Sequence, residues 1–226
     1  FGGGFACPRV KNEDSDISGT HRVGEVHCVE PLPINFALLQ NASAKLDLSE
    51  KKGWHLTQAA VSSVDGTIKF PEAEAGTESI GMHDCLSNPT SVKCLDVQMY
   101  SLESYVSKYV KSLGPIDVLQ IDVEGWDFDV LFGAGSVLDR SKYVEFEYHQ
   151  VGHWKDLSLP TAVELLDVKG FTCYWAGKAQ LWRITGCNFD YYQHWHGWSN
   201  VACVHRLNSL LAQRMEDMFI ATLKSW

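Results

Sequence analysis

The sequence predicts an α/β fold: a doubly wound, mostly parallel sheet with helices on both faces. Strand-like and helix-like segments alternate along most of the chain, which is the order typical of parallel sheets. The 226 residues are the size of one ordinary α/β domain. Hydrophobic residues make up 45% and charged residues 21%, and this balance excludes a disordered or fibrous chain.

The first elements follow a polar stretch at 9–22, which has no apolar period and predicts a surface loop. Residues 25–30 (EVHCVE) predict a strand that Pro31 and Pro33 end. Residues 35–46 place apolar side chains at helical spacing and therefore predict a helix.

A second strand is predicted at 54–61. The dipeptide Asp65-Gly66 is typical of a turn and leads into residues 67–70, so we expect a hairpin between these segments. Residues 71–96 are polar and irregular, and they predict a long loop of the kind that often carries function.

The central segment has the clearest pattern. Residues 102–113 predict a helix that a Gly-Pro pair ends, and the β-branched run 116–122 (IDVLQID) predicts a buried strand. Gly125 then precedes a helical stretch at 126–138.

The last third continues the alternation. The predicted strands are 143–149, 171–175 and 200–205, and the predicted helices are 161–168 and 207–223. No Pro/Gly-rich linker divides the chain, so we expect one domain over residues 1–206. The C-terminal helix, within 207–226, is expected to pack on that same domain.

Charge and cysteine usage limit the possible partners. The 28 acidic residues outnumber 19 Lys and Arg, and the net charge of −9 argues against nucleic acids and anionic membranes. No run of about 18 apolar residues gives a strong membrane signal in this segment. We therefore expect a small-molecule substrate, while the oligomeric state stays unknown. The seven cysteines have no metal-finger spacing, so we expect reduced thiols, with Cys28, Cys173 and Cys203 in the core.

The first residues form a glycine cluster, Phe1-Gly2-Gly3-Gly4-Phe5, without an initial Met. Glycine lets a backbone approach a nucleotide closely, although a trimmed chain end fits the cluster equally well. The zones of a signal peptide are missing. We expect a further segment upstream of Phe1, which would contain any targeting or anchor sequence. The compartment stays open, with the cytoplasm slightly favoured.

Acidic residues end two of the predicted strands, at the edge where ligands bind in such sheets. A carboxylate at Glu30 can accept both hydroxyls of a ribose, and a solvated strand end is the alternative. Asp122 ends the central strand, where a carboxylate is costly unless it binds something. Glu124 and Asp127 have an alternative role as anions that stabilise the first turn of the following helix.

Alternation along the next strand puts Glu145, Glu147 and His149 on one face. Beside Asp122, Glu147 and His149 would form a general-base pair, with the histidine titrating near neutral pH. An edge strand with a wet face is the alternative. The carboxylates, Glu124 included, also suit a divalent ion, but their spacing matches no metal signature, so we expect no metal site.

The segment between the last two strands is rich in aromatic residues, among them Trp182, Trp195 and Trp198. Aromatic rings with polar edges suit stacking on a sugar or another planar acceptor, and they equally suit plain packing of an insertion. Trp195 and Trp198 are therefore candidate substrate contacts.

Taken in order, these segments resemble the FkbM family of S-adenosylmethionine-dependent methyltransferases. The matching stretches are VHCVEPLP, WHLTQAAVSSVDGTIKF, SLESYV, IDVLQIDVEGWDFDVLFGAG and YVEFEYH, which cover about residues 23–150. IDVEG with the following VL-x-GA is the most specific part. Three features depart from the family pattern: only FGGG remains of the first strand and its glycine loop, Gln120 replaces a Lys, and Glu103 replaces an Asp.

The resemblance implies a Rossmann-like methyltransferase sheet with an antiparallel last strand, and S-adenosylmethionine as the cofactor. The cofactor-binding residues that it implies are Gly2, Gly4, Glu30, Gln58, Ala59 and Asp122. Glu30 holds the ribose hydroxyls and Asp122 faces the methionine ammonium. Glu124 or His149 takes the proton of the acceptor, because a hydroxyl has a high pKa and needs a positioned base.

The implied reaction is methyl transfer to an oxygen, a hydroxyl on a carbohydrate or lipid-like small molecule. Two other classes stay open. One is a binding module that kept the fold and lost catalysis. The other is a nicotinamide-dependent oxidoreductase, against which the absence of a complete G-x-G-x-x-G speaks.

Overall fold

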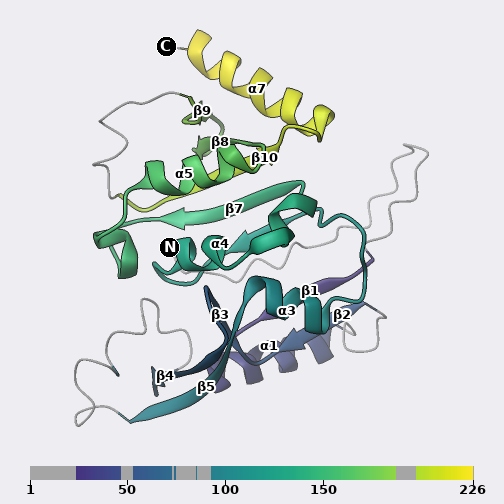
Figure 1. The fold of residues 1–226 in the computed structure, drawn as a ribbon, viewed down its shortest axis with the longest axis vertical. Coiled ribbons are helices and arrows are strands. Elements are labelled where there is room, and N and C mark those ends of the chain that lie inside the picture. Colours follow the sequence, from purple (N-terminus) through teal and green to yellow (C-terminus); the bar gives the residue numbers. More distant parts are fainter. Residues whose placement is uncertain are drawn as a thin grey trace.

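The computed structural model describes residues 24–46, 53–72, 74, 85, 93–186 and 197–225. Within these residues the chain is a mixed α/β structure with sheets of two, three and five strands. Figure 1 shows them along the long axis of the molecule. The helix α7 (Ser209–Lys224) lies at one end, and the strands β4 (Gly66–Pro71) and β5 (Cys94–Ser101) lie at the other.

The two-stranded sheet pairs β1 (Val26–Val29) with β2 (Trp54–Thr57) in parallel. The helix α1 (Pro33–Lys45) connects them, and a proline at its first position is already set to helical φ. The N–H of Glu30 donates to Thr57 O at 3.1 Å, which extends the ladder by one bond. The strand and the helix predicted in this region are confirmed.

The three-stranded sheet has the order β3-β5-β4, in which β3 (Ala60–Ser62) is parallel and β4 antiparallel to β5. Two predictions are wrong here. The strand predicted at 54–61 divides at Gln58 and Ala59 into β2 and β3, which join different sheets. The hairpin at Asp65 does not form, because β5 lies between β3 and β4. The Asp65 carboxylate instead accepts the N–H of Ser101 at the end of β5, at 2.7 Å.

The five-stranded sheet has the order β6-β7-β10-β8-β9. Its strands are β6 (Leu119–Ile121), β7 (Tyr143–Tyr148), β10 (Ser199–His205), β8 (Phe171–Ala176) and β9 (Leu181–Arg183). The last strand, β10, is antiparallel to both of its neighbours, as expected.

The described sheets are less parallel than the sequence predicts. Three strand pairings are parallel and four are antiparallel. The difference comes from β10 between its two neighbours and from the edge strands: β4 returns along β5, and β9 returns along β8 through a short turn. The β8–β9 link is a short return of the kind that produces antiparallel pairs, whereas residues 72–93 separate β4 from β5 along the chain.

The helices beside these sheets are α3 (Leu102–Tyr109), α4 (Asp127–Phe132) and α5 (Leu159–Val168), with 3₁₀ turns η1 (Gly135–Arg140) and η2 (Gly152–Lys155). The helix predicted at 126–138 stops at Gly133, where a Cβ would lie 2.4 Å from Ser62 O. The close backbone approach to β3 therefore breaks the helix into α4 and η1. In the part of the chain that the structure describes, no helix is both long and apolar enough to cross a bilayer.

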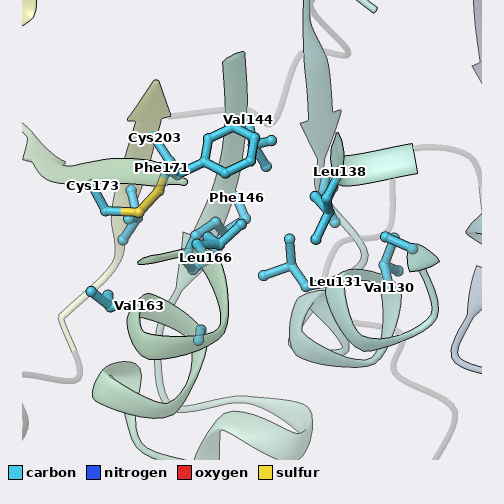
Figure 2. Packing of buried hydrophobic residues seen from close by; sticks show 14 of the residues in the cluster. Val130, Leu131, Leu138, Val144, Phe146, Val163, Leu166, Phe171, Cys173 and Cys203 are labelled. Carbon is cyan, nitrogen blue, oxygen red and sulfur yellow. A yellow bond between two sulfur atoms is a disulfide. The ribbon is translucent and has the colours of Figure 1, made fainter. Parts of the chain in front are cut away.

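The main core lies between the five-stranded sheet and the helices α4, η1 and α5. Figure 2 shows Val144, Phe146 and Phe171 of the strands facing Leu131 and Leu166 of the helices. All five side chains are 1% exposed or less. Burial of one such side chain stabilises the fold by roughly 1.5–3 kcal/mol, so this core fixes the strands that lead to the site.

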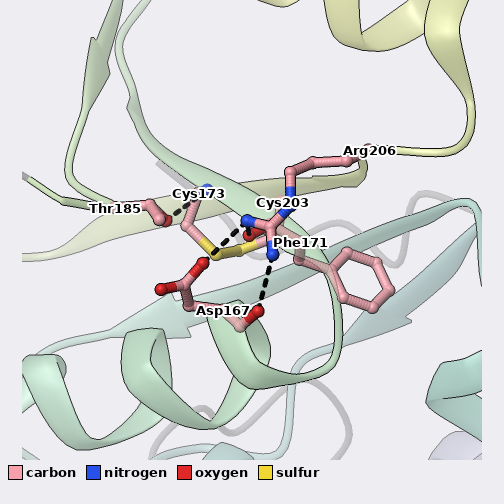
Figure 3. The surroundings of a disulfide bond; sticks show 6 residues. All are labelled: Asp167, Phe171, Cys173, Thr185, Cys203 and Arg206. Atoms are coloured by element: carbon pink, nitrogen blue, oxygen red, sulfur yellow. Dashed lines mark hydrogen bonds and ion pairs between the residues drawn. A yellow bond between two sulfur atoms is a disulfide. The ribbon is translucent and has the colours of Figure 1, made fainter.

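Two disulfides are present, Cys173–Cys203 and Cys85–Cys94. Figure 3 shows the first of them, which joins β8 to β10 at directly opposed positions. The expectation of reduced thiols is therefore wrong for these four cysteines, while Cys28 lies outside both bonds. The spacing of Cys173 and Cys203 along the chain does not show that an antiparallel register sets them face to face.

Candidate functional site

Titratable side chains follow three of the strands, β1, β6 and β7. Glu30 directly follows β1, Asp122 follows β6, and His149 follows β7. Burial raises the pKa of Glu30, and the nearby charge of Asp122 adds to the shift. Asp122 acts in the same way on Glu147, near the end of β7. The structure therefore brings carboxylates from β1, β6 and β7 into one group, which we call the strand-end group: Glu30, Asp122, Glu124, Glu147 and His149.

Glu30 is a buried carboxylate, with 3% of the residue exposed. Its Oε1 accepts the N–H of Leu32 at 2.8 Å, and the Asn35 side chain is a second donor. An ionised carboxylate has about four acceptor positions, so two of them remain. Gln58 and Ala59 follow the end of β2, next to the point where Glu30 pairs with that strand; Gln58 is exposed and Ala59 is buried.

The turn after Asp122 presses its backbone against the segment after β7. Glu124 has φ of +54° and Gly125 has φ of +93°, a region that favours glycine. A Cβ on Gly125 would lie 2.3 Å from Val151 O, and the N–H of His153 donates to Gly125 O at 2.9 Å. This contact holds Glu124 close enough for its charge to raise the pKa of Glu147 further.

Asp127 is fully buried beneath this turn. Its Oδ2 accepts the Gly125 N–H at 3.2 Å and the Trp154 indole N–H at 3.3 Å, and its Oδ1 lies 3.4 Å from the Glu147 N–H. Burial raises the pKa of Asp127 to about 8, and Asp122 adds to the shift. The Asp127 carboxyl group thus connects the turn, β7 and η2 through hydrogen bonds, and its role is structural.

Glu147 lies at the centre of the strand-end group. Its side chain is 20% exposed, and its Oε2 accepts the indole N–H of Trp198 at 2.9 Å. Burial raises the pKa of Glu147 to about 7, and the charge of Asp122 contributes as well. A carboxylate that titrates near neutral pH is well suited to accept a proton and release it again.

His149 is fully buried, and its ring stacks on Trp198 with centroids 4.1 Å apart. Its Nδ1 accepts the N–H of Val151 at 3.0 Å, which places the hydrogen of the neutral ring on Nε2. That Nε2 is buried without a hydrogen-bond partner among the described residues, 3.9 Å from Glu147 Oε2. Burial lowers the pKa of His149 to about 4, so at neutral pH it is an uncharged donor.

The remaining candidates from the sequence are Trp198, Gly2, Gly4 and Trp195. Trp198 lies in the site, in contact with both Glu147 and His149. Gly2, Gly4 and Trp195 lie outside the described residues.

The sequence placed Glu147 in a general-base pair with His149, but it gave the proton-accepting role to Glu124 or His149 and not to Glu147. Strand alternation groups it with Glu145 and His149, and that was the only available signal. The two glutamates differ in their tertiary contacts. Glu145 accepts hydrogen bonds from the Asn200 side chain at 2.7 Å and from the Tyr143 hydroxyl at 2.6 Å. Glu145 is thus engaged within its own sheet.

A separate open depression of about 460 Å³ lies along α3. It is lined by Asp65, Tyr100, Glu103, Ser104, Ser107 and Lys108. None of these belongs to the strand-end group, so the depression and the group are different features of the surface.

Comparison with known proteins gives one match. A family model described as the methyltransferase FkbM domain matches residues 5–172. No curated protein and no solved structure matches the chain. The matched range contains the whole strand-end group and stops at the beginning of β8, so Trp198 and α7 lie beyond it.

Proposed function

Because the chain belongs to the FkbM methyltransferase family, we propose that it transfers a methyl group from S-adenosylmethionine to a hydroxyl of a carbohydrate or lipid-like small molecule. The observation that carries this proposal is the strand-end group. S-adenosylmethionine has a positive sulfonium and a positive ammonium against one carboxylate, and the four clustered carboxylates of the strand-end group favour a ligand of net positive charge. The donor set therefore fits the cofactor.

The finer architecture is part of the proposal. The two-stranded and five-stranded sheets are parts of one Rossmann-like sheet. Two contacts support this: Val29 of β1 packs on the core cluster that contains Ile121 of β6, and Glu30 interacts with Asp122. Residues 1–206 then form one methyltransferase domain, on which α7 packs through Met215.

The cofactor residues follow from this layout. Glu30 uses its remaining acceptor positions for the ribose hydroxyls, and Gln58 and Ala59 lie near the adenine. Asp122 faces the ammonium group, and the backbone of Gly2–Gly4 lies along the methionine part. Bound S-adenosylmethionine supplies a methyl group that is already activated on sulfur, so the chain's main task is to align the acceptor oxygen with it.

The proton of the acceptor passes to Glu147. Of the two residues expected from the sequence in this role, His149 has its Nδ1 lone pair occupied by the Val151 N–H. His149 instead donates from Nε2 to the acceptor oxygen, while Glu147 takes the proton and Glu124 adds negative charge beside it. Trp198 holds Glu147 and His149 together, and Trp198 and Trp195 contact the acceptor.

The test is calorimetric titration with S-adenosylhomocysteine and, separately, with NAD. We expect S-adenosylhomocysteine to bind and NAD not to bind. Asp122→Asn should weaken the binding while leaving the thermal transition nearly in place. Asp139→Asn is the matched control, because Asp139 is an exposed carboxylate paired with Lys169.

Three other outcomes would contradict the proposal or a part of it. Binding of NAD alone would favour an oxidoreductase. Binding of S-adenosylhomocysteine without methyl transfer to any screened glycoside or lipid alcohol would favour a binding module. Equal affinity in Asp122→Asn and wild type would remove Asp122 from the cofactor site.

A further inference from the structure

We propose that Glu25, His27 and His55 form a Zn²⁺ site on the two-stranded sheet. The strand register pairs His27 of β1 with His55 of β2, and Glu25 precedes His27 by two positions. Residues two apart on a strand share a face, so all three side chains lie on the same side of the sheet. One ligand atom from each lies within 4.8 Å of the others.

The spacing is close to what zinc requires. Ligands about 2.0–2.2 Å from a tetrahedral zinc ion stand roughly 3.4 Å apart. His27 Nε2 and Glu25 Oε2 are separated by 3.4 Å. The His27 and His55 rings are stacked with centroids 4.5 Å apart. His55 is exposed, so its ring is free to turn its nitrogen towards an ion held by the other two side chains.

A second observation concerns the other nitrogen of His27. Its Nδ1 lies 3.2 Å from the Tyr105 hydroxyl, which itself lies 3.1 Å from Thr57 Oγ1. Tyr105 is only 2% exposed, so this support is rigid. Metal-binding histidines characteristically hydrogen-bond through the nitrogen that does not touch the metal, because that bond sets the ring orientation. The arrangement leaves Nε2 of His27 directed to Glu25.

The donor types favour zinc over magnesium and calcium. Two imidazoles and one carboxylate match zinc, which takes nitrogen and oxygen ligands and keeps a fourth position for water. Magnesium and calcium prefer all-oxygen sites. The bound ion would link β1 to β2, and β1 is the strand whose carboxyl end carries Glu30. A zinc ion at this site would thus stabilise β1, the strand that positions Glu30, although none of its ligands belongs to the strand-end group.

The test is titration of the metal-free chain with Zn²⁺ and with Mg²⁺, followed by calorimetry and thermal denaturation. We expect one zinc ion per chain and no response to magnesium. At zinc concentrations about 100 times the Kd, mass action predicts a rise in Tm of roughly 5–10 °C. Substitution with Co²⁺ should give the visible absorption of a four-coordinate ion.

Three variants make the assignment specific. His55→Ala removes an exposed ligand, so it should fold normally and bind zinc at least about tenfold more weakly. Tyr105→Phe removes the hydroxyl that contacts His27 and Thr57 but leaves all three ligands in place, and it should weaken zinc binding by about 10–100-fold. His153→Ala is the control, because His153 pairs with Asp129 at 2.8 Å but belongs to no group of three ligands among the described residues, and the substitution should leave zinc affinity unchanged.

The proposal is overturned if zinc binding never saturates or if wild type and His55→Ala bind zinc equally. Should His55→Ala fail to fold, the zinc affinity of Glu25→Gln is compared with that of wild type instead, and equal affinity again overturns the proposal. Cofactor binding is measured separately, so failure here leaves the proposed methyl transfer untouched.

Discussion

One hydrogen bond, from the Val151 N–H to His149 Nδ1, determines what His149 can do. Without it, either ring nitrogen would be available as a base. With it, the neutral ring presents only an N–H, and burial opposes the charged form. Glu147, which is 3.9 Å away, has the complementary property of a carboxylate that titrates near neutral pH.

The first prediction concerns the pH dependence of stability. The pKa of Glu147 in the folded chain is about 7, above its ordinary value of 4.5, so the folded state binds this proton more tightly than the unfolded state. The contribution of Glu147 to stability is therefore complete below about pH 4.5 and is lost as the pH rises to about 7. We expect Glu147→Gln to abolish this loss, and thermal denaturation over a pH series measures it.

Asp127 shifts in the same direction, with a pKa of about 8, but it is present in both proteins and cancels in their difference. Parallel curves for wild type and Glu147→Gln would contradict the assignment. A direct check is ¹⁵N NMR of labelled histidine, which should show His149 with its hydrogen on Nε2 at neutral pH.

At the scale of elements, two turns lock β6 and β7 together. The turn after β6 and the turn after β7 each contain a glycine at positive φ, Gly125 and Gly152, and their backbones touch. This contact determines where Asp122 and Glu124 lie relative to His149.

The second prediction is that Gly125→Ala is strongly destabilising. The new Cβ would lie 2.3 Å from Val151 O at a φ of +93°, so both a backbone clash and conformational strain arise. We expect a loss of more than about 2 kcal/mol in the free energy of unfolding. Gly186→Ala is the matched control: φ is +72° but nothing lies within 4 Å, so only the strain of about 1 kcal/mol applies. Equal losses would show that the turn contact is unimportant.

The third prediction concerns the link between β8 and β10. Cys173 and Cys203 are fully buried and 30 positions apart, so their bond removes considerable freedom from the unfolded chain. The double variant Cys173→Ala/Cys203→Ala should lose roughly 3–4 kcal/mol in chemical denaturation. Cys85→Ala/Cys94→Ala, which opens a span of only 9 positions, should lose less.

Disulfides persist in oxidising compartments, so the formation of these two bonds depends on where the chain resides. Thiol labelling of the denatured, unreduced chain tests their presence. Labelling of all cysteines in the chain isolated from its native cells would contradict the bonds.

At the scale of the whole molecule, the proposed cofactor site spans two sheets, because Glu30 belongs to the two-stranded sheet and Asp122 to the five-stranded one. A ligand held by both would connect them. It would therefore stabilise the molecule as well as occupy the site.

The fourth prediction follows from this position. Glu30→Gln keeps the size of the side chain and an acceptor for the Leu32 N–H, but it removes the charge that favours the ribose hydroxyls. We expect the affinity for S-adenosylhomocysteine to fall by about 1.5–3 kcal/mol, which is about 10–150-fold. The rise in Tm caused by the ligand should shrink accordingly. Unchanged affinity with an intact fold would exclude Glu30 from the cofactor site.

Local patterns along the chain are enough to predict the order of the elements. Strands at 25–30, 143–149 and 171–175 were predicted within one or two residues of β1, β7 and β8. The IDVEG motif indicated the family. These features depend on hydrophobic period, turn residues and motif spacing, which are local properties of the chain.

Which segments contact one another depends on the tertiary structure. Asp65 looked like a hairpin turn but holds Ser101 of β5, and Cys173 lies opposite Cys203 because of the register of β10 with β8. The tautomer of His149 depends on a backbone N–H, and the raised pKa of Glu147 depends on burial and on Asp122. Pairing, burial and electrostatic coupling arise between groups distant along the chain, and no local pattern records them.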